Sequence, residues 1–578
     1  MTRTSTQQQQ LPFADPATPP AARAAPRLRA WLPEACLALA ALVVLTVGLA
    51  SVPLLDPDEP RYADASRGML ETGDLIVPRF NGHERINKPV LFYWLQAAAM
   101  TTIGPAEAAA RAPSVAAALL VLAAVYLFAR RESGRQCALR ASAILLTCPL
   151  FAVVGKTGIT DMLLCLFVLL ALVFWYRSYR GRGNPRLQWI AASLSFGLAF
   201  LAKGPVGLLL PAAIIALFLA LRGDWSAFRL RGTLLGALLA AGVFTPWALL
   251  LVHRLGSAPG SALLDTMERG AKRVLDLLTV ETIERSLHGL DHPEPIFYLA
   301  AASFIVFFPW AFFFPFALAR LLPELRRREP GILFLVTWSL AVLLIFSILR
   351  GKLVTYILPM APPLAMILGR EWTALGEKNL PSKRGTWAIA GCATVTCALS
   401  GLVGYALAAR PDWLDGHSKL LLALAGLTLA AAILPLLARR VEFADIPLAI
   451  AMAVALVAVP IAAGGEIGAR RSLRALAAEA GIGERPWSGV IAYKLYRPSL
   501  PFYGRRIVTM AQEPRELAAA LDAGSLVVIE ESKFRKLPRA WRDAFTVVAA
   551  QGAVLAVSPI TPLPPLRPAR QRSEEGAR

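Results

Sequence analysis

Long apolar runs alternate with short polar loops over most of the chain. About thirteen runs, some of them short, approach the ~20 mostly apolar residues that a membrane-spanning helix needs. They lie at residues 33–54, 112–129, 138–154, 162–176, 187–202, 204–221, 232–252, 296–318, 331–349, 353–369, 386–408, 420–438 and 445–464. The run at 90–104 is shorter and has aromatic residues at one end, so we expect a helix at the membrane surface. The pattern predicts a mainly α-helical, polytopic membrane protein.

Lys and Arg orient this arrangement, because basic loops of membrane proteins stay in the cytoplasm. With thirteen spans and a cytoplasmic N-terminus, the inside loops read ARRESGRQ, RSYRGRGNPR, RGDWSAFRLRG, ARLLPELRRREP, GREWTALGEKNLPSKRG and ARRVEF, and all are basic. The alternate loops are less consistently basic. They fall outside, together with the first external loop at 55–111 and the stretch 253–295.

The character of the chain changes after residue 466. Alternating apolar patches, SGVIAYKLY, RRIVTM and SLVVIEE, are separated by the helix-like EPRELAAALDAG. They predict strands around a helix, hence an α/β domain at 467–560, which the odd number of spans places outside the cytoplasm. We expect residues 31–466 to form the membrane domain. Residues 1–30, on the cytoplasmic side, and the tail at 561–578 have the composition of disordered segments.

Composition agrees with a membrane protein and excludes other classes. Hydrophobic residues make up 56% of the 578 residues and charged residues only 17%, which is outside the range of soluble domains. The net charge of +21 comes mainly from loops between apolar runs, so no nucleic-acid partner is expected. The six Cys lie in or beside apolar segments without metal-ligand spacing, and they predict core residues with no disulfide framework.

Charged residues gather at the outer ends of the predicted spans. The acidic ones are Asp56, Asp58, Glu59 and Asp161, and the basic ones are Arg61, Lys88, Lys203 and Lys352. Charges are costly to hold near a bilayer, so their recurrence on one side indicates a function. Because Arg and Lys suit phosphate, we expect a site for an anionic headgroup. The structural alternative is that the lysines snorkel at helix ends and that Asp161 caps a helix.

Several motifs carry a resemblance to a known superfamily. DPDEPRYADASRGMLETGDLIVPRFNG, KPVLFYWL and ARAPS resemble the first external loop of the protein-O-mannosyltransferase-like membrane glycosyltransferases, which have the GT-C fold and use polyprenyl-phosphate sugars. LAKGPVGLLLP and GKLVTYILPMAPPLAMIL are similar to the aminoarabinose transferase family within it. That family moves 4-amino-4-deoxy-L-arabinose from undecaprenyl phosphate to lipid A phosphates in the Gram-negative inner membrane, which confers resistance to polymyxin and cationic antimicrobial peptides.

The resemblance also implies roles for individual residues. It makes Asp58, Glu59 and Asp161 candidate catalytic residues, assigns the carrier phosphate to Arg61, Lys88, Lys203 and Lys352, and assigns other substrate contacts to Tyr62, Tyr356, His292 and Tyr298. One departure is Asn87, where the family pattern has Glu. If the acceptor is a phosphate, it is already ionised and needs no general base. Asp58 would then orient the nucleophile, bind the sugar amine or stabilise the developing cation.

This chemistry requires no cofactor, and the expected partners are the lipid-linked donor, the lipid A acceptor and membrane lipids, with the protein as a monomer. His83, Glu84 and His253 could bind zinc or another divalent ion, but their spacing is no metal signature. Two alternatives stay open. One is a protein O-glycosyltransferase with the same carrier and a Ser or Thr acceptor; the other is a lipid-linked sugar transporter, which should show internal repeats.

Overall fold

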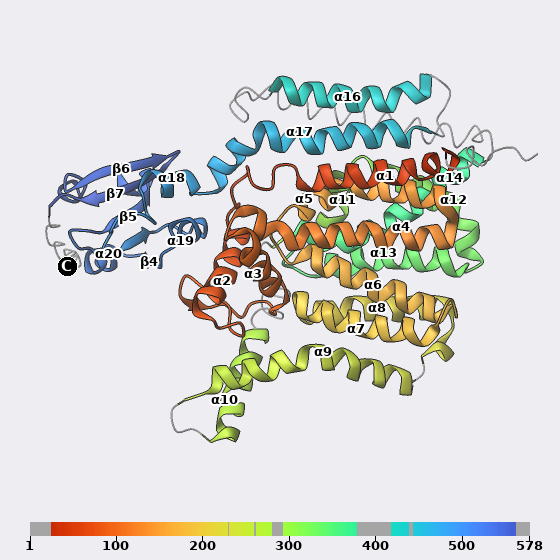
Figure 1. Cartoon of the computed structure of the whole chain (residues 1–578), viewed down its shortest axis with the longest axis horizontal. Helices are drawn as coiled ribbons and strands as arrows, with labels where there is room; N and C mark the ends of the chain where they lie inside the picture. Colours follow the sequence, from red (N-terminus) through yellow and green to blue (C-terminus); the bar gives the residue numbers. More distant parts are fainter. Residues whose placement is uncertain are drawn as a thin grey trace, which may run out of the picture.

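The structure, a computed structural model, describes residues 25–228, 230–258, 262–279, 293–377, 418–437 and 443–561. A bundle of helices makes up most of it, and a mixed α/β domain lies beyond one end of that bundle (Figure 1). Both parts of the predicted architecture are therefore present. The apolar run at 386–408 and the tail after residue 561 lie outside the described residues.

The predicted apolar runs are largely helical. The bundle comprises α1 (Ala25–Thr46), α4 (Glu107–Leu146), α5 (Pro149–Gly155), α6 (Asp161–Tyr179), α7 (Pro185–Lys203), α8 (Val206–Arg222), α9 (Leu230–Gly256), α11 (Tyr298–Val306), α12 (Phe314–Arg326), α13 (Pro330–Ile348), α14 (Ala361–Glu377), α16 (Ser418–Leu437) and α17 (Asp445–Arg471). Among the described residues, five helices are long and apolar enough to cross a membrane, or six with one bent pair, and three more are apolar but shorter. These are fewer than the thirteen predicted. Helix α1 also begins inside the stretch predicted to be disordered.

Helix α4 contains two passes of the chain. Gly134 interrupts it with a non-helical backbone (φ 87°, ψ 173°), which glycine adopts without steric cost. After this break the chain runs back beside the first arm. The two passes lie in close contact, since a methyl group built on Gly155 would lie only 3.1 Å from the Cβ atom of Ala118. The predicted separation of the runs at 112–129 and 138–154 is therefore correct.

The predicted span at 296–318 is not one continuous helix. Helix α11 ends at Val306, a 3₁₀ turn η4 (Trp310–Phe313) follows, and α12 leaves at 111° to α11. Proline explains the break, because Pro309 has no N–H group and disfavours helical backbone in Phe308 before it. The apolar run is therefore helical in two parts with a sharp bend between them, and the predicted crossing of the membrane by residues 296–318 stays a prediction.

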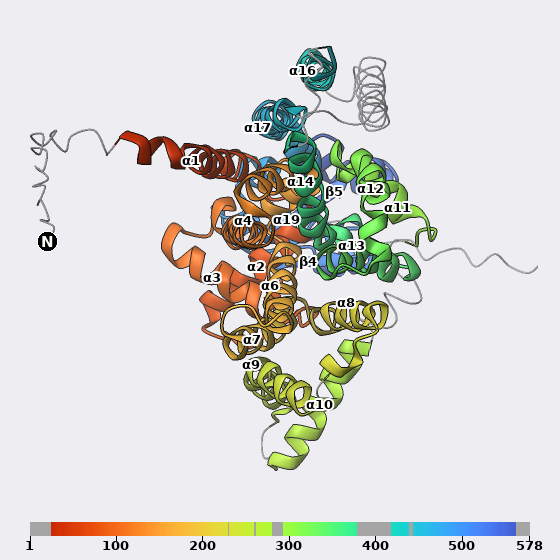
Figure 2. The ribbon, with the colours of Figure 1, turned by 90° about the vertical axis from the view of Figure 1, so that its right-hand side faces the viewer.

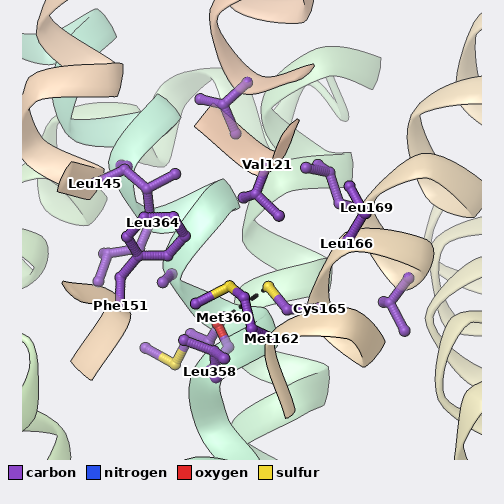
Figure 3. Close-up of a cluster of buried hydrophobic side chains, with 14 of the residues drawn as sticks. Val121, Leu145, Phe151, Met162, Cys165, Leu166, Leu169, Leu358, Met360 and Leu364 are labelled. Carbon is purple, nitrogen blue, oxygen red and sulfur yellow. Dashed lines mark hydrogen bonds between the residues drawn. The ribbon is translucent and has the colours of Figure 1, made fainter. Parts of the chain in front are cut away.

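Figures 1 and 2 place the pair α16 and α17 on one side of the bundle and the pair α9 and α10 (Leu263–Thr279) on the other. Between them, helices α4, α5, α6 and α14 share one apolar core. Figure 3 shows part of it, with Val121, Phe151, Leu166 and Leu364 in one cluster of buried side chains. Here the 3₁₀ helix η5 (Val354–Met360) precedes α14, so the run predicted at 353–369 is helical in two parts.

The first external loop folds at the end of the bundle next to the α/β domain (Figure 1). It contains α2 (Asp58–Thr72), a short hairpin of β1 (Arg79–Phe80) and β2 (His83–Glu84), and α3 (Leu91–Ile103). Helix α3 confirms the helix predicted at 90–104. Its position at a membrane surface stays a prediction.

The α/β domain is built on a five-stranded sheet in the order β4-β3-β5-β7-β6. Its strands are β3 (Val490–Tyr493), β4 (Val508–Ala511), β5 (Leu526–Glu530), β6 (Phe545–Gln551) and β7 (Val554–Pro559), and its helices are α18 (Arg474–Glu479), α19 (Ser499–Gly504), α20 (Pro514–Ala520), α21 (Glu531–Phe534) and α22 (Arg539–Arg542). The first three strands are parallel, which agrees with the predicted strands and helix. The antiparallel hairpin of β6 and β7 was not predicted as strands.

Several polar contacts dock this domain on the first external loop, among them those of Asp56 and Asn81. Buried Asp56 accepts hydrogen bonds from the backbone N–H and the hydroxyl of Ser499, both at 2.7 Å. The Asn81 side chain donates to the carbonyl of Val508 at 2.8 Å and accepts from its N–H at 2.7 Å. Because β4 is an edge strand, Asn81 satisfies backbone groups that no neighbouring strand pairs. The loop and the domain thus form a joint unit.

Asp56 gives this docking a testable dependence on pH. Burial raises the pKa of Asp56 above its ordinary value of 3.8, although the bonds from Ser499 act in the opposite direction. The folded state therefore binds the proton more tightly than the unfolded chain, so docking should weaken as pH rises through the folded pKa. Asp56→Asn should flatten that dependence. Asp56→Ala should cost about 1–3 kcal/mol, because it leaves the Ser499 donors unpaired.

Hydrogen exchange of residues 490–511 in the full-length protein measures the docking. The control is Asp543→Ala, since Asp543 lies in the same domain with 69% of its side chain exposed. Unchanged protection in Asp56→Ala would contradict a docking role.

Candidate functional site

The adjacent acids Asp58 and Glu59 begin α2 but point to different surroundings. Successive residues of a helix project about 100° apart, and here one faces solvent while the other faces the core. The Asp58 side chain is 51% exposed, whereas that of Glu59 is 2% exposed. Negative charge in a first helical turn also suits the helix dipole. Of the two, Asp58 is the one that a substrate can reach.

Glu59 belongs to a buried ion pair with Arg111 of α4. Its two carboxylate oxygens accept from Nε and Nη2 of Arg111 at 2.8 and 2.7 Å. The backbone N–H groups of Gly158 and Leu55 donate to the same oxygens at 2.7 and 3.0 Å. The guanidinium of Arg111 also donates to three carbonyls after α1, those of Leu49, Val52 and Pro53. This geometry makes Glu59 an anchor of the loop, and its predicted catalytic role stays a prediction.

Three residues of the predicted site form one cluster at the ends of helices. Asp161 is the first residue of α6 and Lys203 the last of α7, so the antiparallel packing of these helices brings them together. Nζ of Lys203 lies 2.8 Å from Oδ1 of Asp161. The same ammonium lies 5.0 Å from the ring centre of Tyr356 in η5, within cation–π range. The cluster therefore holds a cation at a fixed place.

The segment that carries Lys88 packs against this cluster. Gly204 follows Lys203 with a φ of 79°, and a methyl group built on it would lie 3.8 Å from the ring of Pro89. Lys88 directly precedes that proline and is partly buried. The two lysine-containing motifs, from the first external loop and from the end of α7, are thus neighbours in space.

Tyr62 lies in a buried group with Tyr93 and Arg85 near the start of α2. It is buried on α2, its ring centre lies 5.5 Å from that of Tyr93, and the Arg85 guanidinium stands 5.4 Å from it. Burial raises the pKa of the Tyr62 hydroxyl, and the charges of Tyr93, Asp58 and Asp161 raise it further, whereas Arg85 acts against them. The hydrogen bond from the N–H of Gly158 to Glu59 brings the segment that contains Asp58 next to the segment that leads to Asp161.

Lys352 is in a different environment from Lys203. It is 3% exposed, and Nζ donates to the backbone carbonyl of Glu294 at 2.6 Å. Next to this bond, Pro293 and Gly351 form an isolated β-bridge. Lys352 therefore fixes the segment that leads to Tyr298 at the start of α11. No sequence pattern pointed to this backbone partner of Lys352, and the predicted residue His292 lies outside the described residues.

The candidate metal ligands do not come together. His83 and Glu84 are exposed in β2, and Glu84 pairs with Arg273 of α10 at 3.0 Å. His253 lies near the end of α9. In the part of the chain that the structure describes, no group of three His, Cys, Asp or Glu side chains could hold a metal ion.

Arg85 and Arg111 had no role in the sequence interpretation. Arg85 lies in the first external loop between two of the motifs that carry the resemblance, and Arg111 lies in one of them. Arg111 stands in ARAPS at the start of an apolar run, where a buried charge needs a partner. The position of Arg111 at the start of an apolar run was therefore the sequence signal that could have identified it as part of a buried ion pair. The partner itself, 52 residues away in the chain, was not identifiable from spacing.

Comparisons with known proteins identify the family. Residues 87–249 match the family described as dolichyl-phosphate-mannose-protein mannosyltransferase. The chain is 32% identical to undecaprenyl phosphate-alpha-4-amino-4-deoxy-L-arabinose arabinosyl transferase 2 of Proteus mirabilis, over 55% of each chain. It is 30% identical to the protein of the same name from Sodalis glossinidius, over 66% of this chain and 67% of that one. The matched region thus spans about half to two thirds of the length of these relatives.

The fold comparison extends over nearly the whole chain. The crystal structure of ArnT from Cupriavidus metallidurans bound to undecaprenyl phosphate superposes with a TM-score of 0.76 at 21% identity. It covers 93% of this chain and 100% of that one. The apo crystal structure of the same protein gives a TM-score of 0.73. The fold is therefore the GT-C fold of membrane glycosyltransferases.

The different surroundings of Asp58 and Glu59 predict different effects of neutral substitutions. Glu59→Gln should lower the free energy of unfolding by about 3–5 kcal/mol, because it leaves Arg111 charged and buried without its counter-ion. Asp58→Asn should change it by at most about 1 kcal/mol, since its pair with Arg61 is partly exposed and 3.4 Å long. Denaturant unfolding of the purified protein in detergent measures both. Equal losses would mean that Glu59 is not the anchor described above.

Proposed function

Because this chain belongs to the undecaprenyl phosphate-4-amino-4-deoxy-L-arabinose arabinosyl transferase family, we propose that it transfers 4-amino-4-deoxy-L-arabinose from undecaprenyl phosphate to a phosphate group of lipid A. The observation that carries the proposal is the Asp161–Lys203–Tyr356 cluster beside the exposed Asp58. It supplies a fixed cation and an exposed carboxylate at one end of the bundle. A glycosyl transfer from a phosphate carrier needs both.

The bond that breaks joins the anomeric carbon of the sugar to an oxygen of the carrier phosphate. Its electron pair leaves with the phosphate, and the sugar acquires oxocarbenium character. Lys203 is placed to stabilise the departing phosphate, since preorganised charge outside bulk water acts strongly on developing charge. Asp161 holds the ammonium and is a positioning residue in this step. An oxygen of the acceptor phosphate then forms the new bond, so undecaprenyl phosphate and glycosylated lipid A result.

Asp58 acts on the sugar and the acceptor side. A phosphate acceptor is ionised near neutral pH, so no proton has to be removed before it attacks. Asp58 can instead bind the ammonium of the aminosugar or stabilise the positive charge that develops at the anomeric carbon. Its neighbour Arg61, whose Nη1 lies 3.4 Å from Oδ1 of Asp58, is placed to orient an acceptor oxygen.

The basic loops support an orientation in which the site and the α/β domain face the periplasm. The family resemblance supports a location in the inner membrane. Donor and acceptor are both lipids, so each can reach the site by diffusion in the membrane. We propose a monomer that uses no cofactor.

Mass spectrometry of lipid A tests this function. A Gram-negative host without its own transferase, but able to make the donor, should gain pentosamine on lipid A and resistance to polymyxin when it expresses this chain. Asp58→Asn should reduce the modification by about 10²-fold or more, since loss of one electrostatic group at a transition state has that effect. Asp543→Asn is the matched control for the charge change. Unmodified lipid A with well-expressed wild-type protein would exclude the proposed substrates.

A further inference from the structure

A cleft of about 230 Å³ lies where the first external loop meets the α/β domain. The loop contributes Asn81 and Arg85 to its walls, and the domain contributes Tyr496, Arg497 and Val508. By volume it holds roughly eight waters, which is room for a phosphate group and part of a sugar ring. None of the cleft residues from the α/β domain has a role in the mechanism above.

The cleft is rich in cations. Arg85 and Arg497 line it, and Arg61 stands at its side with the guanidinium carbon 5.0 Å from the Tyr496 ring centre. The Nε atoms of Arg61 and Arg85 are buried and have no hydrogen-bond partner among the described residues. An acid in the lining, Glu84, already pairs with Arg273. Buried N–H donors without acceptors indicate that an anion completes the site.

The walls of the cleft are fixed relative to each other. Asn81 and Val508, which both line it, bond to each other in both directions, and Asp56 holds Ser499 close to Arg497. Nη1 of Arg497 lies 4.0 Å from Oδ2 of Asp56. A site built from two docked units needs little reorganisation to bind a ligand.

The cleft is a second anion site in addition to the Lys203 cluster. The Lys203 cluster at the ends of α6 and α7 is assigned to the donor phosphate, which leaves the cleft for the acceptor. The cleft lies between the external loop and the α/β domain, where a headgroup that projects from the membrane can reach. Arg61 contacts both Asp58 and Tyr496, so a ligand in the cleft lies beside the proposed reaction centre.

We propose that this cleft binds the phosphorylated sugar headgroup of the acceptor, with Arg85 and Arg497 as the cations that recognise its phosphate. The inference rests on the proposed function and adds the place and the residues of acceptor binding. Guanidinium groups present paired N–H donors that match phosphate oxygens. The α/β domain therefore supplies part of the acceptor site.

Steady-state kinetics of the purified full-length protein separate the two substrates. Lipid A is varied at saturating donor, and the donor is then varied at saturating lipid A. Arg497→Met and Arg85→Met should each raise the KM for lipid A by about ten- to hundred-fold, the effect of one lost charge-assisted hydrogen bond, and leave the KM for the donor within twofold. Arg497→Lys should recover part of the affinity. Arg539→Met is the control, because the Arg539 side chain in the same domain is 87% exposed.

The outcomes distinguish the inference from the function on which it rests. Wild-type protein that transfers no sugar with either substrate saturating overturns the proposed function and the inference together. Active wild type with an unchanged lipid A KM in both Met variants overturns the cleft alone. A rise in both KM values together also overturns it, since that pattern reports a general disturbance of the site. Arg85 and Arg497 lie in different units, so a folding defect in one variant leaves the other as the test.

Discussion

The buried ion pair of Glu59 with Arg111 is the interaction on which the external face of the protein depends. It satisfies three carbonyls after α1 and two N–H groups of neighbouring loops, all close to the predicted membrane boundary, where unpaired backbone groups are costly. Neither charge could stay buried alone. Because the pair fixes the start of α2, it also fixes the direction in which Asp58 projects. A structural contact thereby determines where the candidate reactive carboxylate stands.

Around this anchor, the site is assembled from the ends of elements distant in the sequence. Asp161 and Lys203 meet because α6 and α7 are antiparallel, and Tyr356 reaches the same ammonium from the segment before α14. The α/β domain closes the other side through Asp56 and Asn81. Charges held this way keep their strength, because little water screens them. The cation cluster suits a departing phosphate, and the cleft beyond Asp58 suits an incoming one.

The sequence predicted the parts that depend on local pattern and failed where tertiary contacts decide. Periodicity gave most helices and three strands. The family resemblance named Asp161, Lys203 and Tyr356 among the candidate site residues, and the structure brings these three side chains together. Sequence patterns could not assign different roles to Glu59 and Asp58, because only the packing of Arg111 distinguishes these two adjacent acids. The backbone partner of Lys352 comes from a segment 58 residues away, so no local pattern contains it. The broken span at Pro309 and the β6–β7 hairpin had local signals, which apolar composition concealed.

The central claim is that the Asp161–Lys203 pair serves the reaction and is not merely structural. Single-turnover transfer by the double variant Asp161→Asn/Lys203→Met tests this most directly, because removing both charges leaves no unpaired ion in the core. If the pair stabilises the departing phosphate, the double variant should unfold at a temperature close to that of the wild type, while its transfer rate falls by about 10²-fold or more. A folded double variant that transfers the aminosugar at the wild-type rate would contradict the claim.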